Sequence, residues 1–593
     1  MRRVLGGSVV LGLLAFIGLF VAGPLGTPAC AAQPAPLRVG MRILLVSIDG
    51  TDSGIAAWRD LLLDEGVPHD ELHLDREEIE ERSLWDGDMA RFQAIVLADS
   101  HLSRDGRPDL PSLLDPAERQ AISEYQTRTG ARLVAATIVP DPALPLTLAS
   151  TPSDLDGFTG ELTAAGREVF PYLRGSVPIE DAFGFVPTAD VTPDLTPLVE
   201  LPSGQPLVVV ATGATGNETL YVAPQVSQPV LHWRLLRHGL LGWATGGVHL
   251  GLRQLHYAMQ VDDVFLPNFR WDPVRNQTTQ RLGTSQMSPE DVDFAAQWST
   301  ENDLRLDIAY NAAGRTEEMC EAVLAEKAAF GWVSHTYTHR DLDEVSEEDL
   351  VEEITLNRRW AQNHDLPGFR DDELVTGAHT GLENPNMPAA LRQTGIRWIA
   401  SDASKEPAQR PLGDALTVPR YPTDIYYDAS TREEQVDEYN FTYLQSCDPA
   451  VTRCRDEPAD WDAFVEIQSE LMFRHILDGD PRIHYAHQSN MTDDRTIYEP
   501  LEHMLERYRD LIVAPLLQPT LADSGEELRR FAVWSAAVAD GAVEGWLEDG
   551  RVHVRSSVEL EVPVTGADVG AVYAGERVAW VRVAAGGELV LDG

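Results

Sequence analysis

Residues 330–343 read FGWVSHTYTHRDLD, a short apolar run that opens directly into two histidines with the spacing H-x-x-x-H. A second run, LHYAMQV at 255–261, ends in Asp262 and Asp263. Three further apolar runs lead into polar groups: 373–375 before His379, 396–400 before Asp402, and 483–486 before His487. Reactive side chains at the carboxyl ends of successive strands are typical of a β/α barrel, whose active site lies at that face. Residues 251–520 are therefore predicted to form a β/α barrel.

The residue types in these loops predict a metal site. His335 and His339 can direct two imidazoles at one ion, which suits Zn²⁺ or another borderline divalent metal with a carboxylate as third ligand. Residues 336–338 are Thr, Tyr and Thr, so an HExxH motif does not supply the carboxylate, and Asp262-Asp263 is the obvious donor. Adjacent residues at a strand end point in different directions, so one can bind metal while the other acts as a base. Although H-x-x-x-H alone is a weak signal, its place in the ordered series with His487 favours a metal site.

Charge excludes two classes of partner. The chain has 593 residues, with 94 Asp and Glu against 47 Lys and Arg, a formal net charge of −47. Nucleic acids and anionic membrane surfaces both require clustered basic residues, so neither is expected as a partner. The acidic excess fits two readings: a solvated acidic surface, which composition favours, or a cationic ligand or product.

The first 31 residues are predicted to be a signal peptide. Arg2 and Arg3 precede an apolar stretch at 9–22, and Ala29-Cys30-Ala31 resembles a cleavage site. A lipid anchor on Cys30 is the weaker alternative, because residues 27–29 are Thr-Pro-Ala. No later run is apolar for long enough to span a membrane, so a secreted or envelope protein without a span in the mature chain is expected.

Residues 32–150 are predicted to form a doubly wound α/β domain. Apolar runs at 43–46, 94–97 and 133–136 are typical of buried parallel strands. Asp115-Pro116 begins a helix that Gly130 ends. Asp49 and Asp99 follow two of the strands, where such folds bind ligands, but without partners they are interpreted as turn residues.

Two further regions are predicted to be rich in β-structure. Residues 151–250 form an accessory region, and residues 521–593 a small β-sandwich in which Asp549-Gly550 turns a hairpin. Cys447 and Cys454 bracket a short loop and could pair in an oxidising compartment, while a zinc site there would lack a second cysteine pair.

The motifs resemble a known family. VSHTYTHRDLD and VDDVF look like the second and first motifs of the NodB-type polysaccharide deacetylases. The longer stretches HYAMQVDDVFLPN, TGAHTGLENP, VPRYPTDIYY and YAHQSNM resemble the secreted galactosaminogalactan deacetylases of carbohydrate esterase family 18. The resemblance covers residues 250–515 in detail and implies a distorted (β/α) barrel. It also implies an N-terminal region with a carbohydrate-binding module, which places that expectation on residues 151–250.

The resemblance also implies roles. Asp262 would be the general base, Asp263, His335 and His339 the ligands of a divalent metal, expected to be Zn²⁺, and His487 the general acid. The common middle motif contains Arg-Pro, whereas this sequence has Gly-Ala-His-Thr-Gly at 377–381, which leaves open what holds Asp262. His379 is a candidate to contact substrate or base, with a structural role an equal alternative. Asp402 is a second substrate-site candidate that either orients His487 or caps a loop.

The resulting hypothesis is a secreted, metal-dependent N-deacetylase that removes acetyl groups from an N-acetylhexosamine polysaccharide rich in N-acetylgalactosamine. Two alternatives remain. One is a non-catalytic polysaccharide-binding protein on a deacetylase fold, against which the presence of all five motif residues counts. The other is a different glycan hydrolase, such as a glycosidase with two carboxylates, for which the histidines would be surplus.

Overall fold

The structure is a computed structural model that describes residues 36–189 and 192–593. The predicted signal peptide, residues 1–31, lies outside the described residues. In the part of the chain that is described, every helix is too short or too polar to cross a lipid bilayer.

Seven parallel strands carry the predicted active-site loops, in the order β20-β19-β16-β25-β24-β22-β21. Next to the two outer strands, the Val375 amide donates to the Ser334 carbonyl at 2.9 Å, which nearly closes the sheet on itself. The predicted distorted (β/α) barrel is therefore confirmed. The strands are β16 (Met259–Val264), β19 (Leu306–Tyr310), β20 (Gly331–Ser334), β21 (Glu373–Leu374), β22 (Trp398–Asp402), β24 (Ala415–Pro422) and β25 (His484–His487).

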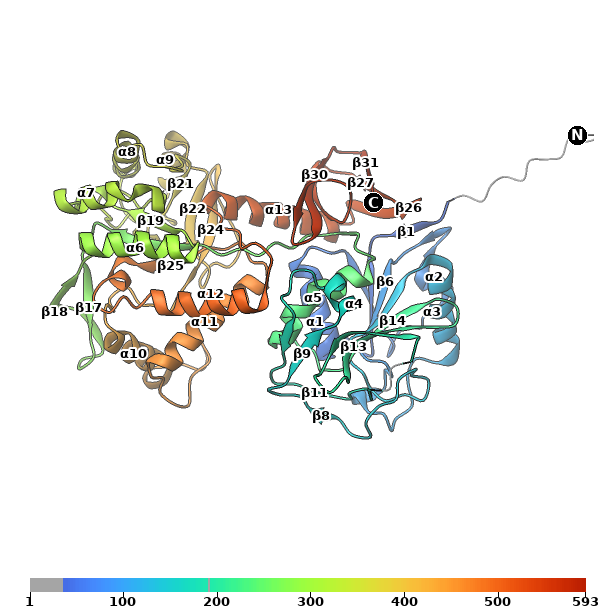
Figure 1. Ribbon diagram of the computed structural model, residues 1–593. Coiled ribbons are helices and arrows are strands. Elements are labelled where there is room, and N and C mark those ends of the chain that lie inside the picture. Colours follow the sequence, from blue (N-terminus) through green and yellow to red (C-terminus); the bar gives the residue numbers. More distant parts are fainter. Residues whose placement is uncertain (1–35, 190–191) are drawn as a thin grey trace, which may run out of the picture. The chain divides into compact units, whose positions relative to one another are not determined.

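Amphipathic helices surround the barrel, and Figure 1 shows them outside the strands. Helix α8 begins at Glu347, because Ser346 caps it and Asp349 completes a capping box. Leu350 and Ile354 on its inner face are buried. The helices are α6 (Pro289–Asn302), α7 (Glu317–Ala325), α8 (Glu347–Asn363), α9 (Met387–Thr394), α11 (Trp461–Leu477) and α12 (Tyr498–Leu511).

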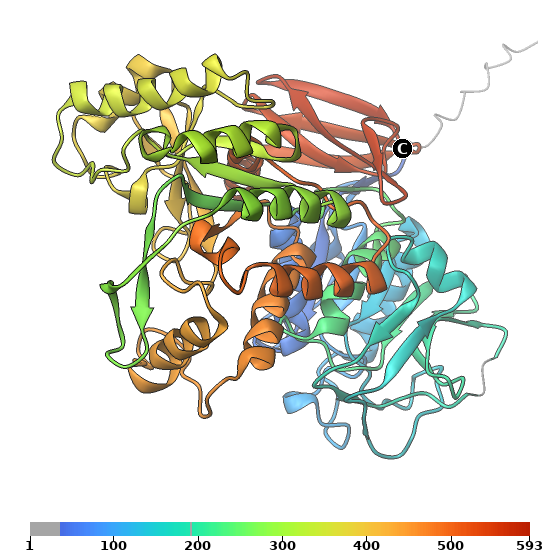
Figure 2. The ribbon, with the colours of Figure 1, turned by 60° about the vertical axis from the view of Figure 1, so that its left-hand side comes forward.

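A hairpin and a helix flank the face where the strands end. The hairpin consists of β17 (Asn268–Asp272) and β18 (Gln277–Ser285), and α10 (Arg432–Asn440) packs beside it. The Trp271 indole donates to Asp437 of α10 at 2.7 Å, and both views show the two elements side by side (Figures 1 and 2). The hairpin therefore has a fixed position next to the loop that follows β16.

The N-terminal strands form one nine-stranded sheet in the order β10-β9-β12-β13-β14-β7-β6-β2-β3. Its parallel half is the predicted doubly wound unit, with α3 (Pro116–Thr129) capped by Asp115 and ended by Gly130. Its other half is antiparallel, and β14 pairs parallel with β7. The predicted boundary at residue 150 therefore falls inside a single sheet, because the β-rich segment adds its strands to the α/β unit. The strands are β2 (Ile43–Ser47), β3 (His69–His73), β6 (Ala94–Leu97), β7 (Arg132–Ala135), β9 (Thr159–Leu162), β10 (Ser176–Pro178), β12 (Leu195–Glu200), β13 (Pro206–Thr212) and β14 (Glu218–Val222).

The C-terminal strands form two antiparallel sheets after the long helix α13 (Leu521–Ala539). The predicted hairpin joins β26 (Val543–Glu548) to β27 (Arg551–Ser556), and Asp549 and Gly550 both have positive φ, as a type I′ turn requires. Strands from the N-terminal half complete both sheets, so the sandwich is not built from residues 521–593 alone. These are β1 (Arg38–Gly40), which pairs with β26 and continues through β5 (Met89–Ala90) to β4 (Trp85–Asp86), and β15 (His249–Leu250), which pairs with β28 (Leu560–Thr565).

Candidate active site

All seven predicted site residues line one pocket of about 470 Å³ at the carboxyl ends of the barrel strands. Their convergence depends on the parallel register, which for example sets Asp262 of β16 directly opposite His487 of β25. The lining residues are Asp262, Asp263, Leu266, Pro267, Asn268, Phe269, His335, His339, Ala378, His379, Asp402, Lys405, Tyr427, Tyr485 and His487.

Asp263, His335 and His339 form a set of potential metal ligands. One ligand atom from each lies within 4.8 Å of the others. Asp263 Oδ1 is 3.3 Å from His335 Nε2 and 3.0 Å from His339 Nε2. Burial alone would raise the pKa of Asp263, but hydrogen bonds from the two imidazoles lower it well below its usual value. Two imidazole nitrogens and one carboxylate oxygen in a buried cluster fit a zinc-type ion with open positions.

Local backbone geometry directs these ligands inward. Asp263 and His339 both adopt positive φ, of 66° and 60°, a strained conformation for residues with a side chain. His335 Nδ1 lies 3.4 Å from the Val375 carbonyl, to which it would donate when Nε2 binds a metal. The buried amide of Asn311 donates to the carbonyls of His335 and Thr336 and holds the start of the H-x-x-x-H loop.

Asp262 is held by an arginine that the sequence analysis did not identify. Arg420 of β24 donates to both carboxylate oxygens, at 2.9 and 2.8 Å, and its side chain is fully buried. Burial would raise the pKa of Asp262, but the Arg420 guanidinium together with His335 and His487 outweighs burial, and the pKa lies well below its usual range. Arg420 therefore supplies the support for Asp262 that the middle motif left open.

His379 contacts this arginine rather than the base. Its Nε2 lies 3.1 Å from Arg420 Nη2. Burial and the neighbouring guanidinium lower the pKa of His379 to about 3, so the neutral ring accepts the hydrogen bond. Of the roles left open for His379, the geometry favours one behind Asp262, although the residue still lines the pocket.

Asp402 caps its own loop. Its carboxylate accepts from the Ser404 amide at 2.9 Å and hydroxyl at 2.6 Å, and it lies 3.5 Å from Lys405 Nζ. Of the two roles considered for Asp402, these contacts favour the loop cap over the orientation of His487. Asp402 nevertheless lies in the pocket lining.

His487 ends β25 beside two aromatic rings. The Tyr427 ring centroid is 5.7 Å away and that of Tyr485 6.1 Å away. Burial lowers the pKa of His487, while the nearby carboxylates of Asp263 and Asp262 oppose that effect. The nearby carboxylates therefore favour the protonated form of this imidazole, and burial favours its neutral form.

Two aromatic residues at the mouth of the pocket were also missed by the sequence analysis. Phe269 and Tyr427 line the pocket and are 41% and 43% exposed. A register irregularity between Phe269 and Arg270 in the β17–β18 hairpin coincides with the exposed phenyl ring. Arg420 is marked in the sequence as a charged residue among the largely apolar residues of β24. No comparable pattern marks Phe269 and Tyr427 as pocket residues.

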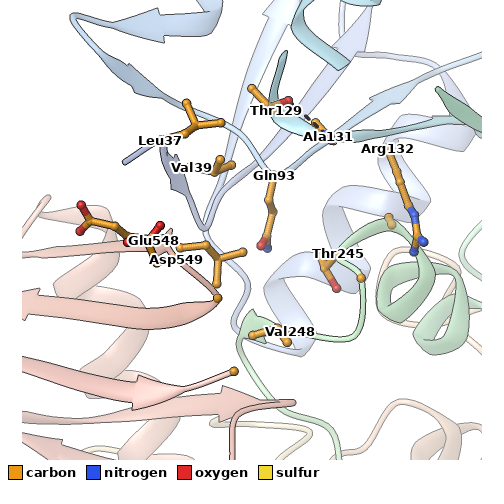
Figure 3. A pocket seen from close by; sticks show the side chains of 16 residues that line it. Leu37, Val39, Gln93, Thr129, Ala131, Arg132, Thr245, Val248, Glu548 and Asp549 are labelled. Atoms are coloured by element: carbon orange, nitrogen blue, oxygen red, sulfur yellow. Dashed lines mark hydrogen bonds between the residues drawn. The ribbon is translucent and has the colours of Figure 1, made fainter. Parts of the chain in front are cut away.

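A second cavity, of about 560 Å³, has a different character (Figure 3). It lies between β1, the ends of α3 and α5 (Leu231–Ala244), and the β26–β27 turn. Among the described residues that line it there is no histidine or cysteine. Arg132 at its edge is engaged by Glu218 at 2.9 Å. The larger of these two cavities therefore lacks imidazole and thiol groups among its described residues, and the candidate active site is the barrel pocket.

Comparisons with known proteins agree with this location. The family model described as "Agd3 deacetylase domain" matches residues 319–500, a segment that contains His335, His339, Arg420 and His487. The crystal structure of Agd3, described as a novel carbohydrate deacetylase, has a TM-score of 0.75 at 17% identity and covers 94% of this chain and 99% of that one. No curated protein matches the chain.

Two further solved structures have only weak similarity. A putative polysaccharide deacetylase from Mycobacterium smegmatis has a TM-score of 0.30 at 12% identity, over 47% of this chain and 93% of that one. A family 4 carbohydrate esterase from Streptomyces lividans in complex with acetate has a TM-score of 0.24 at 12% identity, over 44% and 100%. Fold and family model agree: residues 319–500 match the Agd3 deacetylase domain model, the whole chain has the fold of the Agd3 structure, and together they indicate an enzyme of the carbohydrate esterase class.

Proposed function

We propose that this protein is a secreted, metal-dependent N-deacetylase that hydrolyses acetyl groups from an N-acetylhexosamine polysaccharide, rich in N-acetylgalactosamine. One observation carries the proposal: the ligand set Asp263, His335 and His339 shares a pocket with Asp262, which is ionised and clamped by Arg420. The metal ligands and the proton acceptor line the same pocket, as metal-assisted amide hydrolysis requires.

A divalent ion, expected to be Zn²⁺, would be held by Asp263 Oδ1 and the Nε2 atoms of His335 and His339. When bound, it would polarise the acetyl carbonyl and lower the pKa of water towards ~7. Asp262 is placed to accept the proton of the attacking water, because Arg420 keeps it ionised and fixes both of its oxygens. His487 is placed to pass a proton to the departing amine, so acetate and a free amino sugar result.

The mouth of the pocket suits a sugar ring. Phe269 and Tyr427 present exposed aromatic faces, and such surfaces pack well against the apolar faces of pyranoses. Lys405 and Asp402 supply polar groups elsewhere in the lining for sugar hydroxyls. The galactosamine preference rests on the sequence resemblance rather than on these contacts.

Export is supported by the cysteines. Cys447 and Cys454 form a disulfide, a bond that persists mainly in oxidising compartments. It agrees with the signal peptide predicted for residues 1–31. Fractionation of a tagged protein would test this part, with retention in the cytosol as the contradicting result.

The decisive experiment measures acetate release from an N-acetylgalactosamine-containing polymer by the metal-free protein, the zinc-restored protein and the Asp262→Asn variant. Release that requires both zinc and Asp262 is the expected result. Free amines without chain shortening would separate this activity from that of a glycosidase. Polymer binding without release from any N-acetylhexosamine polymer would instead support a binding protein on a deacetylase fold.

A further inference from the structure

Asp263 uses its two carboxylate oxygens differently. Oδ1 faces the Nε2 atoms of His335 and His339, at 3.3 and 3.0 Å. Oδ2 turns away from them and accepts a hydrogen bond from Asn268 Nδ2 at 2.7 Å. Asp263 and Asn268 are each 6% exposed, so bulk water competes little for either oxygen. The two oxygens are thus already assigned to different partners within the protein.

The orientation of the Asn268 amide is determined by a chain of contacts that begins at the backbone. The Met287 amide donates to Gln488 Oε1 at 2.7 Å, and Gln488 Nε2 donates to the Ser285 carbonyl at 3.0 Å. Because a backbone N–H only donates and a carbonyl only accepts, the Gln488 amide has a single orientation. Its Nε2 also donates to Asn268 Oδ1 at 2.5 Å, so Asn268 must present Nδ2 to Asp263.

We infer that Asn268, oriented by Gln488, is a positioning residue that restricts Asp263 to a single oxygen in metal coordination. The inference rests on the proposed function, since it concerns the ligand set of the same site. A carboxylate whose second oxygen is held by a donor offers only the first, and partners of metal ligands commonly orient them in this way. Coordination positions are then left for water and the acetyl oxygen, which a chelating carboxylate would partly fill.

The network also connects the two sides of the pocket. Asn268 begins β17 of the flanking hairpin, while Gln488 directly follows the proposed general acid His487. Gln488 is 1% exposed and makes its contacts with Asn268 of β17, with β18 and with the segment after β18. The hairpin therefore helps to hold the metal ligand Asp263, because its position beside the loop after β16 brings Asn268 to the Asp263 carboxylate.

The test compares Asn268→Ala and Asn268→Leu with wild type, with Gln280→Ala as a matched control. Leucine fills the space of asparagine without a donor, and Gln280 is an exposed amide on β18 of the same hairpin. Zn²⁺ affinity is measured by competition with a chelator, and the visible absorption of the Co²⁺-loaded proteins reports coordination number. Melting of the metal-free forms reports whether each variant folds.

Both Asn268 variants are expected to bind Zn²⁺ about 10–100-fold more weakly, and their Co²⁺ bands to weaken as Asp263 becomes free to chelate. Gln280→Ala should match wild type in both measurements. Folded Asn268 variants with wild-type Zn²⁺ affinity and an unchanged Co²⁺ spectrum would overturn the inference. If wild type itself bound neither ion, the metal site of the proposed function would fail, a result distinct from failure of the Asn268 contact.

Discussion

The barrel and the N-terminal sheet both place carboxylates after parallel strands, yet only the barrel builds a reactive site from them. Asp49 accepts from the amide and hydroxyl of Thr51, at 3.0 and 2.7 Å, and Asp99 accepts from the amides of His101 and Leu102, at 2.7 and 2.6 Å. These partners are near neighbours in the sequence, so each carboxylate caps its own turn, as the sequence interpretation held.

In the barrel the partners come from other strands. Asp262 on β16 meets Arg420 on β24, and Asp263 meets His335 and His339 from the loop after β20. A carboxylate at a strand end therefore becomes reactive when distant elements supply its partners. It remains structural when its own turn supplies them.

The largest effect is expected from His335→Ala. Loss of one of three ligands should remove bound metal and reduce acetate release to background, measured as metal content and activity of the same preparation. The matched change in the other region is His101→Ala, which removes a histidine near Asp99 and should leave both quantities unchanged. Retention of stoichiometric metal and activity by His335→Ala would show that these histidines are not ligands.

Asp262→Asn should reduce kcat by about 10²–10⁴-fold, the range for loss of a general base. Metal content should remain at the wild-type level, because Asp262 is bonded to Arg420 rather than to the ligand histidines. Steady-state kinetics and metal analysis provide the two readouts. Equal loss of metal and of rate would instead place Asp262 among the ligands.

Arg420→Gln should change the pH dependence of activity. With Arg420 present, the pKa of Asp262 is lowered well below its usual value, so the base is ionised across the working range. Without the guanidinium, burial raises that pKa, and the acidic limb of the kcat/KM profile should move to higher pH.

Arg420→Gln also leaves a buried carboxylate unpaired, at a cost of about 3–5 kcal/mol in unfolding free energy, so profiles must be recorded well below its melting temperature. Arg392→Gln, at a 65% exposed side chain, is the control. A pH profile identical to wild type would show that Arg420 does not control the ionisation of Asp262.

Phe269→Ala and Tyr427→Ala should raise KM for the polymer several-fold with little change in kcat, because stacking on these rings contributes binding rather than chemistry. Hydrolysis of a small acetyl ester that cannot reach the rings should be unaffected. A selective fall in kcat would assign these side chains to the chemical step instead. Phe158→Ala, a similarly exposed phenylalanine in the N-terminal sheet region, is the control.

The smallest effect on activity is expected from Asp99→Ala. Two backbone amides lose their acceptor, so stability should fall by about 1–3 kcal/mol in denaturant unfolding while acetate release is unchanged. A clear loss of activity would mean that the N-terminal sheet takes part in the reaction and would break the comparison.

Several elements followed from local sequence alone. The helix start at Asp115 and the turn at Asp549-Gly550 appear where their residues predict them, since each depends on contacts within a few residues. The apolar runs before Asp262 and His335 likewise marked strands of the barrel. Local sequence does not reveal the pairing of β14 with β7, which joins segments that are more than 80 residues apart.

The sequence by itself determined the kinds of reactive group and the order in which strand ends deliver them, because both are written in short motifs. Tertiary structure alone decided their partners. Arg420 is 158 residues from Asp262, and Gln488 is 220 residues from Asn268, so no local pattern connects either pair. Each contact exists because parallel strands or a packed hairpin bring the chains together, and those contacts set the ionisation of the base and the geometry of the metal ligand.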